Sequence, residues 1–448
     1  MEKIGVPKAL LAVAVVLVML TFLVFYAYAY SKETGWDFTY LAYDGGDGRY
    51  AEIAVAEEGE IHVSQWGYYD TPYSLMHSNW TDEEPSPEPI YSFDATHEFQ
   101  WASMAVDDEG VVHVFIGLEY EGVWYANDSG GQWEFAPLPL DDSYDGHATV
   151  DNAGNSHLVY CEVDTYDIVY ATDSGGAWTT EVLYDTPTDP DSTPPFNQMR
   201  ASVLGLCSDS QNRLHALLGV SNPQILFPLE LVYAEQGASG WSLVDILEDY
   251  TVVGMPSMAL ADDGTAHVSL YVSEGDSYSS GDTYSIAHAS GRNTSDSWNI
   301  EVVQEAGNID PWSSAIAVSE LDEVHISFFE HYYDSDTASD EHSLWYARLS
   351  DGAQSTQRVS LEFALGGKGR TSIAVDEYGN AHMVLSKLDS GGYSRCTHVS
   401  EKTSGDIAAE SLAYALGNTA LVALPTGAIA AGVFFLAKKR RTRRPGID

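Results

Sequence analysis

The sequence predicts an all-β protein, a seven-bladed β-propeller with an N-terminal and a C-terminal membrane segment. A short phrase recurs seven times across the middle of the chain, and each copy is followed by segments of strand length that are rich in β-branched and aromatic residues. Between the two apolar ends, no stretch keeps the period of a helix. Four strands in about 45–55 residues make one blade of a propeller, so seven copies predict seven blades.

The first apolar run spans residues 9–29 and follows two lysines. A run of ~20 apolar residues is long enough to cross the hydrocarbon core of a bilayer. The run also ends in an Ala-Tyr-Ala triplet, which is a small-x-small cleavage site. Residues 1–30 are therefore predicted to be a signal peptide or an N-terminal membrane anchor, and the sequence leaves both open.

A second apolar run spans residues 413–437, after a linker at 401–412, and a basic tail at 438–448 follows it. Clusters of Lys and Arg beside a membrane segment stay on the cytoplasmic side. We therefore expect a transmembrane helix with a cytoplasmic tail. Residues 31–400 then form an extracytoplasmic propeller that is held at the cell membrane by its terminal segments.

The composition is strongly acidic, with 67 Asp and Glu against 20 Lys and Arg and a net charge of −47. Nucleic-acid binding depends on Lys and Arg side chains that contact phosphate groups, so no nucleic-acid partner is expected for so acidic a chain. The 28 Tyr, 14 Phe and 11 Trp can fill a large core, which argues against disorder. Three cysteines are present, and Cys161 and Cys207 either pair or remain buried thiols.

The repeated phrase reads apolar-Ala-Val-Asp-x-x-Gly-x-apolar-His-apolar, most clearly at residues 104–114 and 373–383. Every copy ends with an anchoring histidine: His62, His113, His157, His215, His267, His325 and His382. Equivalent positions in seven blades are spread around a ring, so these side chains cannot converge on one metal ion. We expect them to share a structural hydrogen bond.

Each repeat divides into four strands, named A to D. Strand A precedes the Asp-x-x-Gly turn, strand B begins near the histidine, and strand C carries a second marker at 74–77, 123–126, 168–171, 231–234, 284–287, 344–347 and 393–396. Strand D follows a polar turn and usually a Trp, namely Trp80, Trp133, Trp178, Trp241 or Trp298. The seventh repeat lacks strand D. Residues 36–41 are predicted to supply it, which closes the ring and removes an open edge.

Residues 126–133 and 171–178 resemble the Asp box, Ser-x-Asp-x-Gly-x-x-Trp, although both have Ala for the leading Ser. The Asp box marks the BNR-repeat propellers, which include the sialidases. Asp and Gly build the tight turn and Trp fastens it to the sheet, so its role is structural. The resemblance implies a sialidase-like exo-glycosidase as an alternative to a binding module.

Sialidases hold the substrate carboxylate with three arginines, and one of them lies in a Phe/Tyr-Arg-Ile-Pro motif. This chain has no such motif. Arg49, Arg200 and Arg370 nevertheless fall near the starts of strands A, which is where the resemblance implies anion-binding arginines. No catalytic residue is assigned, because no Gly-x-Ser-x-Gly or His-Glu-x-x-His motif is present.

Antiparallel strands alternate in direction, so the A–B and C–D turns share one face of the ring, here the turn face. The B–C and D–A connections share the other, here the loop face, where connection length varies most. Strands A start at the loop face, with Trp101, Trp312 and the three arginines as candidate ligand contacts. The chain enters and leaves at the turn face, so the loop face is predicted to point away from the membrane.

Asp334, Asp336 and Asp340 alternate along one acidic run and could offer oxygen ligands to calcium. They lack the spacing of an EF-hand, and a solvated acidic loop is the preferred interpretation. The sequence favours a cell-surface recognition module that binds a glycan, a peptide or a surface-protein partner through its loop face. A sialidase-like glycoside hydrolase and a structural envelope component are the alternatives.

Overall fold

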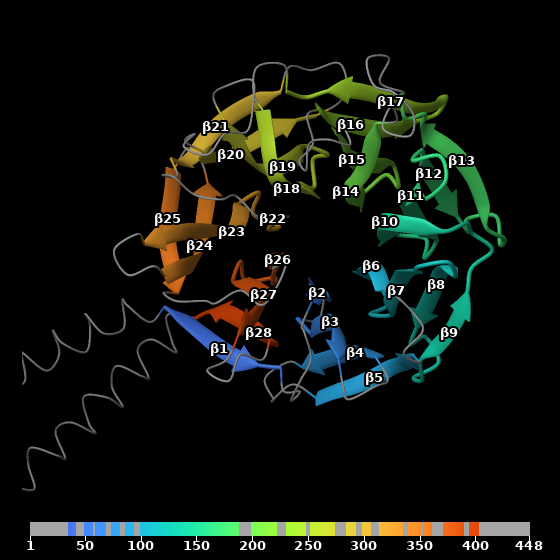
Figure 1. The fold of residues 1–448 in the computed structure, drawn as a ribbon, viewed down its shortest axis with the longest axis horizontal. Coiled ribbons are helices and arrows are strands. Elements are labelled where there is room, and N and C mark those ends of the chain that lie inside the picture. Colours follow the sequence, from blue (N-terminus) through green and yellow to red (C-terminus); the bar gives the residue numbers. More distant parts are fainter. Residues whose placement is uncertain are drawn as a thin grey trace, which may run out of the picture. The chain divides into compact units, whose positions relative to one another are not determined.

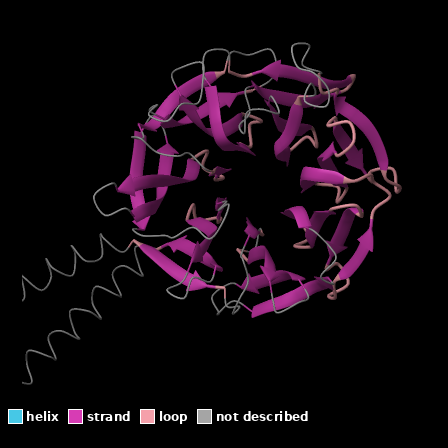
Figure 2. Ribbon diagram, in the orientation of Figure 1, coloured by secondary structure: helices cyan, strands magenta, loops and turns pink. Residues whose placement is uncertain are grey.

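The computed structural model describes residues 35–41, 49–56, 59–68, 73–80, 86–93, 99–187, 199–221, 230–247, 251–273, 284–292, 298–305, 313–334, 339–350, 353–360, 371–388 and 394–402. Every regular element within these ranges is a strand (Figure 2). No helix that could span a membrane occurs among the described residues. The predicted segments at 1–30 and 413–437 lie outside the described ranges.

The chain divides into two units. The smaller unit joins the two ends of the chain, Met1–Asp37 and Glu401–Asp448. Within it, the amide of Lys402 donates to the Gly35 carbonyl at 2.9 Å, and the Lys402 ammonium lies 3.2 Å from an Asp37 carboxylate oxygen. The larger unit, Phe38–Ser400, holds the propeller.

Seven four-stranded antiparallel sheets form the ring in Figure 1, which confirms the predicted seven-bladed all-β fold. Blade 1 consists of β2 (Arg49–Val55), β3 (Ile61–Tyr68), β4 (Tyr73–Trp80) and β5 (Ser86–Phe93). Blade 2 consists of β6 (Phe99–Val106), β7 (Val112–Leu118), β8 (Gly122–Asn127) and β9 (Glu134–Pro137). Blade 3 consists of β10 (Ser143–Val150), β11 (Ser156–Glu162), β12 (Ile168–Thr172) and β13 (Thr179–Tyr184).

The ring continues with the same four-strand order. Blade 4 consists of β14 (Arg200–Ser208), β15 (Leu214–Ser221), β16 (Glu230–Gly237) and β17 (Gly240–Asp245). Blade 5 consists of β18 (Thr251–Leu260), β19 (Ala266–Ser273), β20 (Tyr284–Gly291) and β21 (Asn299–Glu305). Blade 6 consists of β22 (Ser314–Val318), β23 (Val324–Asp334), β24 (Ser339–Ser350) and β25 (Ala353–Ser360).

Blade 7 is completed by the N-terminal strand. Its order is β1 (Trp36–Tyr40), β28 (Ser394–Glu401), β27 (Ala381–Leu388) and β26 (Thr371–Val375). The Leu41 amide donates to the Cys396 carbonyl at 3.1 Å just beyond β1. The prediction that residues 36–41 provide the missing strand D is therefore confirmed. Hydrogen bonds between the two ends of the chain close the ring.

Burial follows the position of a strand within its blade. Strands A surround the centre in Figure 1 and strands D lie at the rim. β7 is buried at every residue, because the neighbouring blades cover both of its faces. The first four residues of β13 are exposed. Apolar clusters join consecutive blades, as where Val159 and Ile168 pack with Val203 and Leu218.

The first residue of each A–B turn closes that turn with a hydrogen bond from its backbone amide. In blade 2, the amide of Asp107 donates to the Val111 carbonyl at 3.0 Å, and one Asp107 carboxylate oxygen accepts from the Glu109 and Val111 amides at 2.9 and 2.8 Å. Gly110 has φ +78°, a left-handed conformation that glycine adopts without strain. The recurring Asp and Gly are thus explained by turn geometry.

All three cysteines are free thiols, so Cys161 and Cys207 are not paired.

Candidate functional site

The seven anchoring histidines occupy one position in every blade. Each lies near the start of strand B. Its Nδ1 atom lies within hydrogen-bonding distance of a strand C side chain, two residues before the residue that pairs directly with the histidine. That partner is a tyrosine hydroxyl in blades 2, 3, 4 and 6, namely Tyr125, Tyr170, Tyr233 and Tyr346, at 2.7, 2.8, 2.5 and 2.6 Å. In blades 1, 5 and 7 it is a histidine Nε2 atom, from His77, His288 and His398, at 3.1, 2.9 and 3.2 Å.

These partners correct the alignment of the second marker. In four blades the strand C tyrosine precedes an alanine, as the sequence pattern assumed. In blades 1, 5 and 7 the equivalent residue is histidine, so the predicted markers at 74–77, 284–287 and 393–396 are out of register with the others. A pattern built on Tyr-Ala could not identify a position where imidazole replaces phenol.

The far side of the imidazole often meets the aspartate of the A–B turn. Nε2 of His113, His157, His215 and His382 lies 3.3, 3.2, 3.4 and 3.5 Å from a carboxylate oxygen of Asp107, Asp151, Asp209 and Asp376. One carboxylate therefore closes the turn with one oxygen and orients the histidine with the other. This repeated arrangement joins turn, strand B and strand C, and it is a structural element of the fold.

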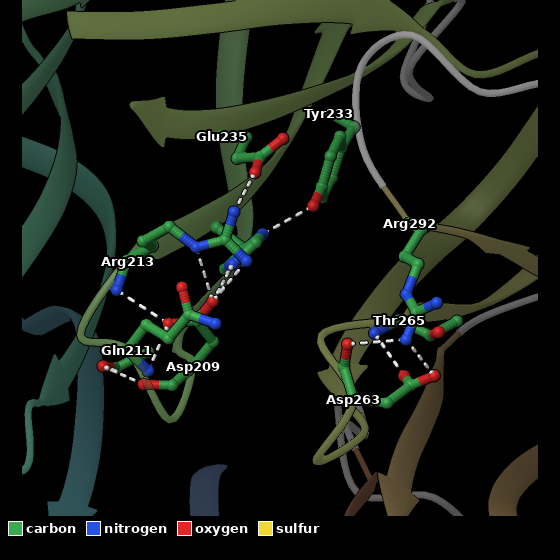
Figure 3. A network of polar contacts seen from close by, with 10 residues as sticks. Asp209, Gln211, Arg213, Tyr233, Glu235, Asp263, Thr265 and Arg292 are labelled. Carbon is green, nitrogen blue, oxygen red and sulfur yellow. Dashed lines mark hydrogen bonds and ion pairs between the residues drawn. The ribbon is translucent and has the colours of Figure 1, made fainter. Parts of the chain in front are cut away.

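Figure 3 shows how arginines complete this network on the turn face of blades 4 and 5. Arg213 bonds Asp209 through two of its nitrogens, at 2.8 and 2.7 Å, and Glu235 through a third at 2.8 Å. Burial raises the pKa of the Asp209 carboxyl, but hydrogen bonds from the Arg213 and Gln211 amides and from the Arg213 side chain outweigh it, so the net pKa is lowered. Arg292 likewise bonds Asp263 at 2.5 Å.

The loop face has a different arrangement, centred on Tyr166 and Arg200. Tyr166 lies in the B–C loop of blade 3, and Arg200 is the first residue of β14. The Arg200 guanidinium carbon lies 5.8 Å from the centre of the Tyr166 ring, within the range of a cation–π contact. Tyr144 meets Tyr166 edge to face at 5.6 Å, and its hydroxyl donates to the Ala201 carbonyl at 2.9 Å.

Backbone and side-chain contacts hold Tyr166 in an unusual conformation. Its φ is +61°, a left-handed value that costs a residue with a Cβ atom about 1–2 kcal/mol. The Tyr166 amide donates to the Glu162 carbonyl at 3.0 Å, and its own carbonyl accepts from the Thr186 hydroxyl at 2.5 Å. Strained residues of this kind gather at functional sites, which makes Tyr166 a candidate.

Tyr120 occupies the corresponding B–C turn of blade 2. Its φ is +62° and 81% of its surface is exposed. Two neighbouring blades thus present a left-handed tyrosine on the same face. Neither residue was a predicted contact, and the loop that holds Tyr166 contains no glycine to mark a left-handed backbone.

Arg200 is exposed, and among the described residues its guanidinium has no carboxylate partner, whereas Arg213 and Arg292 each bond at least one. Arg348 also bonds a carboxylate, that of Glu323. In a chain with a net charge of −47, an exposed guanidinium without an acidic partner among the described residues is a candidate ligand contact. Arg200 and Tyr120, which are exposed, and the partly buried Tyr166 are the candidate ligand contacts of the loop face.

The other predicted contacts lie elsewhere or outside the described residues. Trp101 is only 1% exposed, and its Nε1 donates to the Ser143 hydroxyl at 3.0 Å between blades 2 and 3. The indole packs against Gly117 and Gly146, so it fills the blade interface and leaves no open face for a ligand. Arg49 begins β2, but its side chain is not described, and Trp312 and Arg370 lie outside the described ranges.

The predicted calcium ligands are placed only in part. Asp334 and Asp340 lie near the ends of β23 and β24, where Asp340 pairs with Tyr333 and Asp334 with Ser339. Their side chains and the whole of Asp336 fall outside the described residues. No cluster of three or more metal-binding side chains occurs in the part of the chain that the structure describes.

No protein-family model matches this chain, and no curated protein matches it. Solved structures share its propeller fold, among them a polysaccharide lyase and a sialidase. An ulvan lyase bound to -[GlcA(1-4)Rha3S]- aligns with a TM-score of 0.55 at 13% identity, over 83% of this chain and 98% of that one. The NanB sialidase from Streptococcus pneumoniae aligns with a TM-score of 0.43 at 11% identity, over 82% of this chain and 70% of that one.

Proposed function

We propose that this protein is a cell-surface recognition module that binds a glycan on the loop face of its propeller. The observation that carries the proposal is the position of Arg200. Its guanidinium lies over Tyr166 on that face and has no carboxylate partner among the described residues. On the turn face, Arg213, Arg292 and Arg348 are all engaged by acids.

The chemistry of this site suits a sugar. Tyrosine rings offer apolar faces to the C–H groups of a pyranose, and a guanidinium offers several donors to hydroxyl or carboxylate oxygens. Tyr120 extends the site with a ring that is 81% exposed. The ulvan lyase that shares the fold is bound to a glycan at its own site, which supports the proposal by analogy of fold only.

The location at a membrane is part of the proposal. In the larger unit, Phe38 of β1 and Ser400 of β28 lie toward the turn-face end of blade 7, as the strand order requires. We propose that the loop face, where Arg200 lies, points away from the membrane. The Asp128 and Asp173 carboxylates accept from the Val112 and Ser156 amides at 2.9 and 2.7 Å, which supports an Asp-box role for these two turns.

Binding of glycan by the full chain, purified in detergent, is tested on an array of immobilised glycans. Arg200→Gln and Tyr120→Ser should each weaken binding about tenfold or more, because each removes a contact group without disturbing the core. Tyr378→Ser is the matched control: Tyr378 is 76% exposed but lies in an A–B turn on the opposite face.

Equal loss in all three variants, or no glycan bound by the parent protein, contradicts the proposal. Release of product from a bound glycan would instead favour the hydrolase alternative. That alternative requires Arg49 and Arg370 to converge with Arg200.

A further inference from the structure

Blades 1, 5 and 7 differ from the others in one chemical respect. Their strand C partner is histidine, so two imidazole rings stack where the remaining blades have imidazole and phenol. The ring centres are 5.3 Å apart for His62 and His77, 5.1 Å for His267 and His288, and 5.4 Å for His382 and His398. His62, His77 and His398 are at most 4% exposed.

Two imidazoles can share a hydrogen bond only while one of the facing nitrogens is unprotonated. A tyrosine hydroxyl both donates and accepts, so it suits either state of its histidine partner. Protonation of both rings in a histidine pair removes the hydrogen bond and leaves two buried like charges. The three histidine pairs are therefore intolerant of acid in a way that the phenol-containing blades are not.

The acidic groups around blades 7 and 1 compensate only part of this charge. His382 faces Asp376 at 3.5 Å and His62 faces Glu60 at 3.8 Å, with Asp128 also acting on His62. His77 lies 3.6 Å from Glu88. His398 faces His382 and the edge of Trp80, and no carboxylate of the described residues acts on it.

Burial, reinforced by the charge of the paired ring, lowers the pKa of His398 to about 3 and that of His77 to about 4. Burial also lowers the pKa of His62. In blades 4 and 6, burial likewise lowers the pKa of His215 and His325, but each of those blades contributes one such ring.

Blade 7 is also the only one of the seven described sheets whose four strands are not consecutive in the chain. β1 reaches blade 7 only by hydrogen bonding with β28, the strand that carries His398. Trp80 of blade 1 then packs against His398 across the interface. Loss of packing at His398 therefore affects both the closing strand and the contact with blade 1.

We propose that the histidine pairs of blades 7 and 1 form an acid-sensitive closure, so that the ring opens within blade 7, between β28 and β1, while the blades that lack a histidine pair remain folded. This property is independent of what the loop face binds. Opening there releases β1, which is attached to the N-terminal apolar segment.

The test is hydrogen–deuterium exchange of the full chain in detergent, with peptides compared at the same pH. In the parent protein, the exchange rate of peptides from β27–β28 and β3–β4 is divided by that of peptides from β15–β16 at the same pH. This ratio should be about tenfold larger at pH about 4 than at neutral pH. The double variant His77→Tyr/His398→Tyr installs the partner used by four other blades and should abolish this difference. His288→Tyr in blade 5 is the matched control and should leave it unchanged.

A second variant keeps the test decisive if the double variant does not fold. Tyr346→His creates a histidine pair in blade 6, and peptides from β23–β24 should then gain acid-dependent exchange. Uniform loss of protection in all blades, retained protection of β27–β28 in acid, or unchanged exchange at β23–β24 in Tyr346→His would each overturn the proposal.

Discussion

Trp80 of blade 1 meets His398 of blade 7 edge to face, with ring centres 4.9 Å apart and planes at 75°. The same relationship recurs around the ring. Trp133 meets His77 at 5.0 Å, Trp241 meets Tyr170 at 5.4 Å and Trp298 meets Tyr233 at 5.0 Å, always from one blade to the strand C partner of the previous blade. The tryptophan at or next to each of these C–D turns is thus a contact between blades.

Trp80→Ala should lower the free energy of unfolding by about 2–4 kcal/mol, because it removes a large ring from the interface that closes the propeller. Chemical denaturation followed by far-ultraviolet circular dichroism measures the change. Trp80→Phe should recover about half of the loss, since a smaller ring still contacts the imidazole. A loss below about 0.5 kcal/mol for the alanine variant would show that the contact contributes little.

His215→Ala should destabilise the protein by about 1–3 kcal/mol, because it leaves the Tyr233 hydroxyl buried without its 2.5 Å partner and removes one contact of an Asp209 oxygen. The pairwise term is isolated by a double-mutant cycle with Tyr233→Phe. Additive effects of the two substitutions would contradict a direct interaction between imidazole and phenol.

Gly117→Ala should destabilise blade 2 by about 1–3 kcal/mol, because a Cβ atom would lie 2.1 Å from Nε1 of the buried Trp101. Gly130→Ala is the matched control, since a Cβ atom there meets nothing within 4 Å. Thermal unfolding of both variants gives the comparison. Equal midpoints would mean that the indole of Trp101 is not packed as described.

Global stability should fall as the pH drops from about 6.5 to about 4. Burial and the neighbouring imidazole lower the pKa of His77 and of His267 to about 4 in the folded protein. In this pH range the unfolded chain therefore binds protons that the folded chain does not bind. The free energy of unfolding decreases as the pH falls. Each such histidine contributes up to about 1.4 kcal/mol per pH unit.

Urea unfolding at several pH values measures this dependence. His267→Gln should reduce its slope by about one proton. Constant stability between these pH values would rule out neutral buried histidines.

Much of the fold followed from the repeated phrase. Its seven histidines indicated seven blades, and the missing strand after Val399 indicated closure by residues 36–41. Asp107 and Gly110 lie in the turn where local backbone chemistry requires them. These features are predictable because a turn, a strand period and a repeat length depend on residues that are close in sequence.

The candidate site was predictable only in part. Arg200 was expected at the start of a strand A, but its contact with Tyr166 joins two different blades, and no local pattern specifies it. Trp101 lies near the start of a strand A, where ligand contacts were predicted. Its indole is nevertheless buried against Gly117 and Gly146.

The sequence by itself determined the repeat, its turns and the number of blades. Tertiary structure alone decided which rings are buried between blades and which remain exposed on the loop face. The physical reason is that burial and unpaired charge depend on what neighbouring blades bring to a residue, from ~45–60 positions away along the chain.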